Sequence, residues 1–296
     1  MQTPWGEFPV SDAHAHFFSY RFFQSLAAQA GKSPEEVTGA LGCGLPAEDP
    51  ATLARQWAAE LDRHGVERSV LIASVPGDEA SVLAALDACP GRFRAYAMVN
   101  PIAQSAAVGE GLSAICLFPA MHRYSIQDPR VEPLIAEAAA RDVALFVHCG
   151  VLSVGVRGAL GLPSPFDMRF SNPVDLHAVA LRHPRARFII PHFGAGYLRE
   201  ALMVASLCPN VYLDTSSSNS WMRYEGLDLA AVFARVLSVT GPKRILFGTD
   251  SNLSFPRGWN VRVFEAQAQA LSGLGISQAD ARAIFGGNLD RLHEKN

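Results

Sequence analysis

Val143–Cys149 reads VALFVHC and Arg187–Phe193 reads RFIIPHF. Both stretches are almost continuously apolar, are no longer than a strand, and contain a histidine near their end. Such runs are typical of parallel strands that are buried on both faces. Six similar runs occur along the chain, mostly separated by Ala/Leu/Arg-rich stretches of helical character: Phe8–His16, Arg68–Val75, Arg92–Asn100, Ala114–Pro119, Val211–Ser216 and Arg244–Asp250. The alternation predicts repeated βα units and a (β/α)8 TIM barrel.

The stretches between these runs show helical periodicity. In Pro50–His64, the residues Leu53, Trp57 and Leu61 recur at helical spacing, which predicts one apolar face. Further helices are predicted at Asp128–Arg141, Asn172–His183 and Ser277–His293, the last of which begins with a capping-box-like S-x-x-D. A doubly wound sheet is the competing fold, but its glycine-rich phosphate loop is missing after the first strand. We therefore expect a single barrel domain over residues 1–296.

Two connections are longer than a minimal barrel needs. Residues 18–48, after the first predicted strand, mix aromatic residues with Gly and Pro, and we expect a small inserted cap there. Residues 151–171, after the fifth predicted strand, are rich in Gly, Pro and Ser. Since long loops at one end of a barrel carry function, both segments are expected beside the site.

The composition excludes several classes of protein. Of the 296 residues, 49% are hydrophobic and 18% are charged, which is enough for a large core and too little charge for a disordered chain. The net charge of −3 indicates neither a nucleic acid nor an anionic membrane as partner. The apolar runs are too short to span a membrane. Five scattered cysteines without a C-x-x-C pair, and the lack of a basic and then apolar leader, predict a cytoplasmic protein without a signal peptide.

Chemically capable side chains gather at strand ends. The first predicted strand contains DAHAHF, in which His14 and His16 project to the same side because residues two apart in a strand do so. Paired imidazoles can hold one metal ion, although two ordinary polar side chains are the alternative. Three other predicted strands end in a metal-capable residue: His148, His192 and Asp250. Barrel strands deliver such residues to a shared site at their carboxyl ends.

The motifs DAHAHF, IIPHFGAG (189–196), FGTD (247–250) and IFGGNLDRL (284–292) together resemble the amidohydrolase superfamily. The resemblance runs nearly end to end. It is to the amidohydrolase-related branch that includes aminocarboxymuconate-semialdehyde decarboxylase. By position it implies that His14, His16, His148 and Asp250 bind the metal, and that His192 lies beside the bound water or substrate.

The resemblance also implies the number of metal ions. Dinuclear members of the superfamily carry a carboxylated lysine on the fourth strand, but here that strand reads SAICLFPAMH (113–122), with Cys116 where related sequences often have lysine. We therefore expect one divalent ion, zinc, with manganese as the alternative. We interpret Cys116 as a buried structural thiol; the alternative is a further ligand.

The expected chemistry assigns the two catalytic residues different tasks. A bound ion would lower the pKa of its water to about 7. Asp250 would take the water proton and pass it to the leaving group, and His192 would polarise a carbonyl or stabilise the developing oxyanion. Asp12 is interpreted as a supporting residue that is not itself a ligand.

Substrate contacts are predicted from the loops: Arg157, Arg169, His122 and Trp221. Two more loop arginines, Arg223 and Arg257, offer the same planar fork for a substrate carboxylate. For each of these residues, a solvated or packing role is the alternative.

Three functions remain. The first is hydrolysis, in which metal-activated water attacks a lactone, ester or amide carbonyl of a small, carboxylated substrate. The second is metal-dependent nonoxidative decarboxylation of an aromatic or enoic acid, and the third is a non-catalytic binding protein. The filled ligand positions disfavour the third. We favour hydrolysis because HFGAG (192–196) and TSSSNSW (215–221) match no decarboxylase substrate pattern that we can place. We expect a small-molecule substrate and no nucleic-acid or membrane partner. The candidate assembly is a homodimer.

Overall fold

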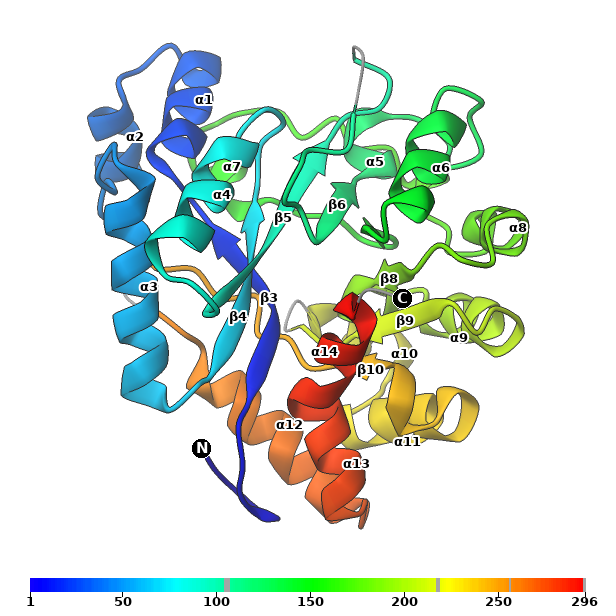
Figure 1. Ribbon diagram of the computed structural model, residues 1–296. Coiled ribbons are helices and arrows are strands. Elements are labelled where there is room, and N and C mark those ends of the chain that lie inside the picture. Colours follow the sequence, from blue (N-terminus) through cyan, green and yellow to red (C-terminus); the bar gives the residue numbers. More distant parts are fainter. Residues whose placement is uncertain (104–106, 217–218, 256, 295–296) are drawn as a thin grey trace.

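Eight short parallel strands form the centre of the molecule in the computed structural model, which describes residues 1–103, 107–216, 219–255 and 257–294 (Figure 1). Neighbouring strands of the sheet follow one another in the chain. They are β3 (Ser11–Phe17), β4 (Arg68–Ala73), β5 (Phe93–Val99), β6 (Ala114–Leu117), β7 (Ala144–Val147), β8 (Phe188–Ile190), β9 (Val211–Asp214) and β10 (Ile245–Leu246). Each coincides with one of the eight predicted runs, so the predicted barrel is confirmed.

The barrel closes between its first and last strands through backbone hydrogen bonds beyond the end of β10. Ala13 N donates to Phe247 O at 2.7 Å, and Asp250 N donates to His14 O at 2.9 Å. A parallel bridge also joins Ala15 to Ser251. Closure therefore brings Asp250 next to the strand that carries His14.

Helices surround the strands (Figure 1). The longer ones are α3 (Pro50–His64), α4 (Glu79–Ala88), α6 (Glu132–Ala140), α8 (Asp175–Arg182), α9 (Leu198–Leu207), α11 (Leu229–Thr240) and α12 (Val261–Gly273). Short helices follow several strands: α5 (Pro119–His122), α7 (Gly155–Ala159) and α10 (Met222–Glu225). Four 3₁₀ turns complete the connections: η1 (Met168–Phe170), η2 (Pro191–Gly194), η3 (Asn219–Trp221) and η4 (Pro242–Arg244).

Helix α3 shows how local sequence places an element against the barrel. Its Asp49 cap accepts hydrogen bonds from two first-turn amides, and Gly65 ends it in the left-handed conformation at φ 67°. Leu53, Trp57 and Leu61 are buried, as their spacing predicted. An Asp cap stabilises a helix by about 1 kcal/mol, and each buried large apolar side chain contributes about 1.5–3 kcal/mol.

Two helices lie in the segment between β3 and α3, where the inserted cap is predicted. Helix α1 (Tyr20–Ala30) is capped by Ser19, and α2 (Pro34–Leu41) begins with a capping box formed by Ser33 and Glu36. Their apolar side chains form a small core against which Val156 and other residues of the predicted long loop pack. Figure 1 shows α1 and α2 at the end of the barrel toward which β3 and β4 point, so they stand beside its mouth.

The two ends of the chain differ from the predicted elements. A hairpin of two-residue strands, β1 (Gln2–Thr3) and β2 (Gly6–Glu7), precedes the barrel, and strands this short leave no periodic signal. The helix predicted over Ser277–His293 is divided into α13 (Gln278–Arg282), a π-helical turn (Ala283–Gly287) and α14 (Asn288–His293). Gly286 breaks it with an extended φ of 174°, and the turn packs its backbone beside Ser11.

The core has two layers. One lies between the strands and the surrounding helices. The other fills the barrel with side chains such as Ile72, Met98, Cys116, Phe146 and Ile189. Burial raises the pKa of the Cys116 thiol well above its ordinary value, which fits a structural thiol. Within the described ranges, no helix combines the length and apolar character needed to cross a membrane.

Candidate metal centre

Three of the predicted ligands converge at the mouth of the barrel. One potential ligand atom from each of His14, His16 and Asp250 lies within 4.8 Å of the other two. Asp250 Oδ1 is 3.0 Å from His16 Nε2 and 3.5 Å from His14 Nε2. Asp250 takes a left-handed backbone conformation, φ 59°, directly after the barrel closes. The strand parity predicted for the two histidines therefore delivers both Nε2 atoms to one carboxylate oxygen.

The outer nitrogens of the two histidines are held by the protein. His14 Nδ1 lies 2.7 Å from Asp214 Oδ2, and His16 Nδ1 lies 2.7 Å from Ser74 Oγ. Ser74 Oγ donates its own hydrogen to Ile72 O at 3.2 Å, so it accepts from His16. Both rings thus carry their proton at Nδ1 when neutral, which leaves the Nε2 lone pairs directed at the point of convergence.

Asp214 can approach His14 only because Gly248 has no side chain. A Cβ at position 248 would lie 2.7 Å from Asp214 Oδ1 and 2.9 Å from His14 Cβ. Asp214 ends β9, is fully buried, and also accepts from Ser216 N at 2.6 Å. The packing therefore requires a glycine at position 248 of the FGTD motif, because a side chain there would collide with Asp214 and His14.

His148 and His192 line the same cavity from positions just beyond the ends of the neighbouring strands β7 and β8. Their ring centroids are 5.3 Å apart, and the His192 ring is 5.1 Å from that of His14. Gly150 allows the two segments to meet, because a Cβ there would lie 2.2 Å from Gly194 O. His148 does not belong to the group of three that lies within 4.8 Å.

His192 does not lie on a strand. Strand β8 ends at Ile190, and His192 follows in the 3₁₀ turn η2 with a left-handed φ of 54°. The apolar run predicted as Arg187–Phe193 continues beyond the strand because Pro191 and Phe193 are also buried. The Nδ1 atom of His192 lies 2.9 Å from Ser216 Oγ and 3.3 Å from Ser216 O.

Burial and neighbouring charges shift the pKa values of the site residues in opposite directions. Burial lowers the pKa of His14, but the charge of Asp214 and its hydrogen bond outweigh this and raise the pKa to about 9. Burial lowers the pKa values of His148 and His192. Burial raises the pKa of Asp250, but the His16 hydrogen bond and the nearby imidazoles hold it well below its ordinary value. His148, His192 and the ionised Asp250 are thus already in the protonation state that a divalent cation requires, whereas His14 carries a proton that a bound cation would displace.

These residues fit a divalent metal ion. Nε2 atoms of two rings and one carboxylate oxygen point at a common centre, and the opposite nitrogens are anchored. His148 Nδ1 is buried and makes no hydrogen bond within the described part of the chain, which would cost about 1–3 kcal/mol if it stayed unpaired. A fourth ligand from His148 would complete the set of imidazoles and carboxylate that zinc accepts.

Asp12 supports this centre from below. It is fully buried and binds Thr249 Oγ1, Trp259 Nε1 at 2.8 Å and the backbone N of His14 at 2.9 Å. Burial raises its pKa to about 6, against the opposing effect of these hydrogen bonds. The carboxylate therefore fastens β3 to the segment that carries Asp250.

The cavity in front of the centre has a volume of ≈ 910 Å³. Several aromatic side chains contribute to its walls: Phe18, Phe22, Phe118, Phe146, Trp221, Tyr224 and Phe255. The Phe18 ring stacks on that of His16 at 5.3 Å. Among the described residues, Arg257 is the arginine in the wall.

The other predicted substrate residues are placed as follows. Trp221 lines the cavity. Arg157 donates to Pro163 O and to Gln29 Oε1 at 2.7 Å, and the exposed Arg169 pairs with Asp167 at 2.6 Å, so neither belongs to the wall. His122 packs beside Tyr124 behind the wall, and its neighbour Met121 faces the cavity.

Three contributing residues escaped the sequence reasoning: Ser74, Asp214 and Ser216. Asp214 is the last residue of β9, and Asp250 likewise follows a strand. The position of Asp214 at a strand end was therefore the signal that could have identified it. The serines carry no such signal, because an isolated hydroxyl after a strand is common in any loop.

The family model for the amidohydrolases matches residues 11–292. No curated protein matches the chain.

Solved structures share the fold at low identity. The 5-carboxyvanillate decarboxylase from Sphingomonas paucimobilis is 15% identical, with a TM-score of 0.62 and coverage of 97% of this chain and 99% of that one. The dihydroxybenzoic acid decarboxylase from Polaromonas sp. JS666, with bound manganese and 2-nitroresorcinol, is 17% identical, with a TM-score of 0.61 and 97% coverage of both chains. A zinc-bound amidohydrolase from Burkholderia multivorans is 15% identical, with a TM-score of 0.61 and coverage of 97% and 99%.

Proposed function

Because the chain belongs to the amidohydrolase family of metal-dependent enzymes, we propose that it hydrolyses a lactone, ester or amide bond in a small carboxylated substrate. Asp250 supports this proposal most directly. Its carboxylate lies where the Nε2 atoms of His14 and His16 converge, at 3.5 and 3.0 Å from Oδ1. An ionised carboxylate at this point is a proton acceptor, which hydrolysis needs when water attacks a carbonyl.

We assign the metal to His14, His16, His148 and Asp250. When bound there, a divalent ion polarises a water molecule or a substrate carbonyl. Zinc suits imidazoles with one carboxylate, and manganese is the alternative, as in the Polaromonas decarboxylase.

His192 would be a second hydrogen-bond acceptor. Ser216 O can only accept, so the 3.3 Å contact places the proton of the neutral ring at Nδ1. Nε2 then presents its lone pair to the cavity. In this form Nε2 can accept a hydrogen bond from the attacking water and orient it. Asp250 would take the proton that this water loses and return the same proton to the leaving group.

Decarboxylation of an aromatic acid is the second candidate, favoured by the aromatic wall of the cavity. Two of the structures that share the fold are decarboxylases of aromatic acids. That reaction requires a proton donor at the ring carbon, whereas Asp250 and the neutral His192 both present acceptors. For this reason we place hydrolysis first.

A direct assay separates the two reactions. Zinc-loaded and manganese-loaded protein is incubated with carboxylated lactones, esters and amides and with hydroxybenzoates, while acid production and CO₂ release are followed in parallel. Hydrolysis predicts acid from a compound of the first group without CO₂, and it predicts that the metal-depleted protein is inactive. Release of CO₂ from a hydroxybenzoate, with no hydrolysis in the panel, would replace this proposal by decarboxylation.

A further inference from the structure

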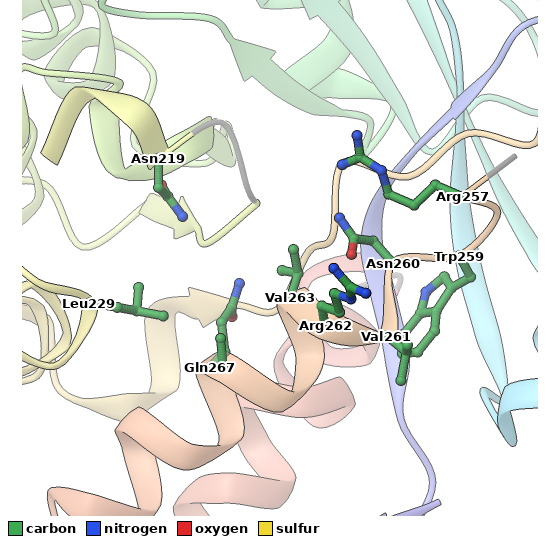
Figure 2. A pocket seen from close by; sticks show the side chains of 10 residues that line it. Asn219, Leu229, Arg257, Trp259, Asn260, Val261, Arg262, Val263 and Gln267 are labelled. Atoms are coloured by element: carbon green, nitrogen blue, oxygen red, sulfur yellow. The ribbon is translucent and has the colours of Figure 1, made fainter. Parts of the chain in front are cut away.

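A second cavity, of ≈ 700 Å³, adjoins the one at the metal centre. It lies at the beginning of α12, between this helix, Asn219 of η3 and Leu229 at the start of α11 (Figure 2). Arg257 and Asn260 line both cavities. The two cavities therefore share this part of their walls.

The second cavity is positively charged. Its wall includes Arg257 and Arg262 and, among the described residues, no Asp or Glu. Neither guanidinium forms a hydrogen bond or an ion pair within the described ranges, unlike Arg130, which pairs with Asp128. Unpaired guanidinium groups beside a cavity are available to a ligand.

Asn260 adds a buried polar group. It is 8% exposed, and its amide side chain makes no hydrogen bond within the described part of the molecule. Figure 2 shows this amide and the guanidinium of Arg257 directed to the same open side of the helix start. The amide atoms themselves are open to the cavity that the residue lines, so a ligand there can pair with them.

The start of α12 contributes the third feature. Asn260 precedes the helix without capping it, while Val261 N donates to Trp259 O and Val263 N to Asn260 O. The backbone N–H of Arg262, which lies between Val261 and Val263 in the chain, has no acceptor in the described residues. The first turn of a 13-residue helix carries a partial positive charge and binds anions through such amides.

We propose that Arg257, Asn260 and the first turn of α12 bind a second anionic group of the substrate, a carboxylate or a phosphate, away from the bond that is broken. The inference rests on the proposed function and narrows its substrate class. The substrate spans both cavities and carries an anionic group at the end remote from the metal centre. Arg257 is then the residue that determines specificity for this group.

The subsite is fixed relative to the metal centre. Asn260 N donates to Ser251 Oγ at 2.8 Å, and Ser251 directly follows Asp250. The backbone that presents the amide is therefore tied to the backbone that presents the metal-binding carboxylate. This sets the length of substrate that can reach both places.

Binding of model anions tests the subsite independently of turnover. Calorimetry measures the Kd of benzoate, of the three benzene dicarboxylates, and of 3- and 4-carboxyphenyl phosphate, using the zinc-loaded and the metal-depleted full-length protein. Arg257→Gln is compared with Arg185→Gln. Arg185 is an exposed arginine before β8, without an ion pair in the described ranges, and so is a matched control outside both cavities.

We expect at least one doubly anionic compound to bind ten-fold or more tightly than benzoate, and the tighter class distinguishes carboxylate from phosphate. In the zinc-loaded protein, Arg257→Gln should abolish this ratio and Arg185→Gln should keep it. In the metal-depleted protein, benzoate and the doubly anionic compounds should bind alike, because one carboxylate is enough to occupy the place at Arg257. A ratio near one in the zinc-loaded wild type, or a ratio that survives Arg257→Gln, would overturn the subsite. Failure of the proposed function would appear elsewhere, as absent hydrolysis, because the ratio compares ligands on the same protein preparation.

Discussion

Asp214→Asn is the most informative single change at the centre, because it alters a residue that holds a ligand without being one. The substitution keeps the size of the side chain and removes its charge. The carboxylate now accepts two donors, His14 Nδ1 at 2.7 Å and Ser216 N at 2.6 Å. An asparagine has only one acceptor oxygen, so its NH₂ group must face one of these two donors.

The magnitude follows from the contact that is lost. A hydrogen bond to a charged group contributes about 1.5–3 kcal/mol, and 1.4 kcal/mol corresponds to about ten-fold in an equilibrium constant. We therefore expect Asp214→Asn to weaken zinc binding by about 10–100-fold, as is usual for the residue that orients a histidine ligand.

Competition with a chelator of known affinity measures this change. Asp290→Asn is the control, since Asp290 pairs with Arg68 and Arg94, away from the centre. The control should bind zinc as the wild type does, and circular dichroism should show both variants folded. Wild-type zinc affinity in folded Asp214→Asn would refute the view that Asp214 orients His14 for metal binding.

Three further predictions concern packing, pH and mechanism. Gly150→Ala should destabilise the protein by about 2–5 kcal/mol in chemical denaturation, the sum of overpacking and a left-handed φ of 77°. Gly91→Ala, with the same φ and nothing within 4 Å of its Cβ, should cost only the about 1–2 kcal/mol of the φ term; equal losses would contradict the packing argument. His293 has its pKa lowered by burial to about 3, so the unfolded chain binds its proton first and stability should fall by about 1 kcal/mol between pH 7 and 5.5. His293→Gln should remove that part of the slope, and an unchanged slope in urea titrations would assign it to other groups. Asp250→Asn should bind zinc weakly and stay inactive under excess zinc, whereas His192→Asn should keep zinc and lose turnover; recovery of Asp250→Asn by excess zinc would leave Asp250 as a ligand only.

The barrel could be predicted because a strand that is buried on both faces appears in the sequence as a short, continuously apolar run. Runs such as VALFVHC are too apolar for a segment exposed to solvent, and the observed β7 lies within that run. The break in the C-terminal helix was missed because the capping-box-like start favoured one helix over Ser277–His293. The available signal was the pair Gly286–Gly287, where the structure breaks the helix.

The site divides in the same way. His14 and His16 could be paired from strand parity, and Asp250 from its place after a strand. The partners of their outer nitrogens could not be found, since Asp214 meets His14 across 200 residues of chain. Loop arginines are the weakest part of the prediction: Arg157 and Arg257 look equivalent in sequence, and only the fold shows that Arg257 lines the cavity.

Metal content tests the central claim most directly, namely one divalent ion held by His14, His16, His148 and Asp250. The protein is loaded with zinc, freed of excess by dialysis and analysed by plasma mass spectrometry, beside His148→Ala treated identically. We predict about one ion per chain in the wild type and a large loss in His148→Ala, with circular dichroism showing an intact fold. Two ions per wild-type chain, or a full equivalent retained by His148→Ala, would contradict the account.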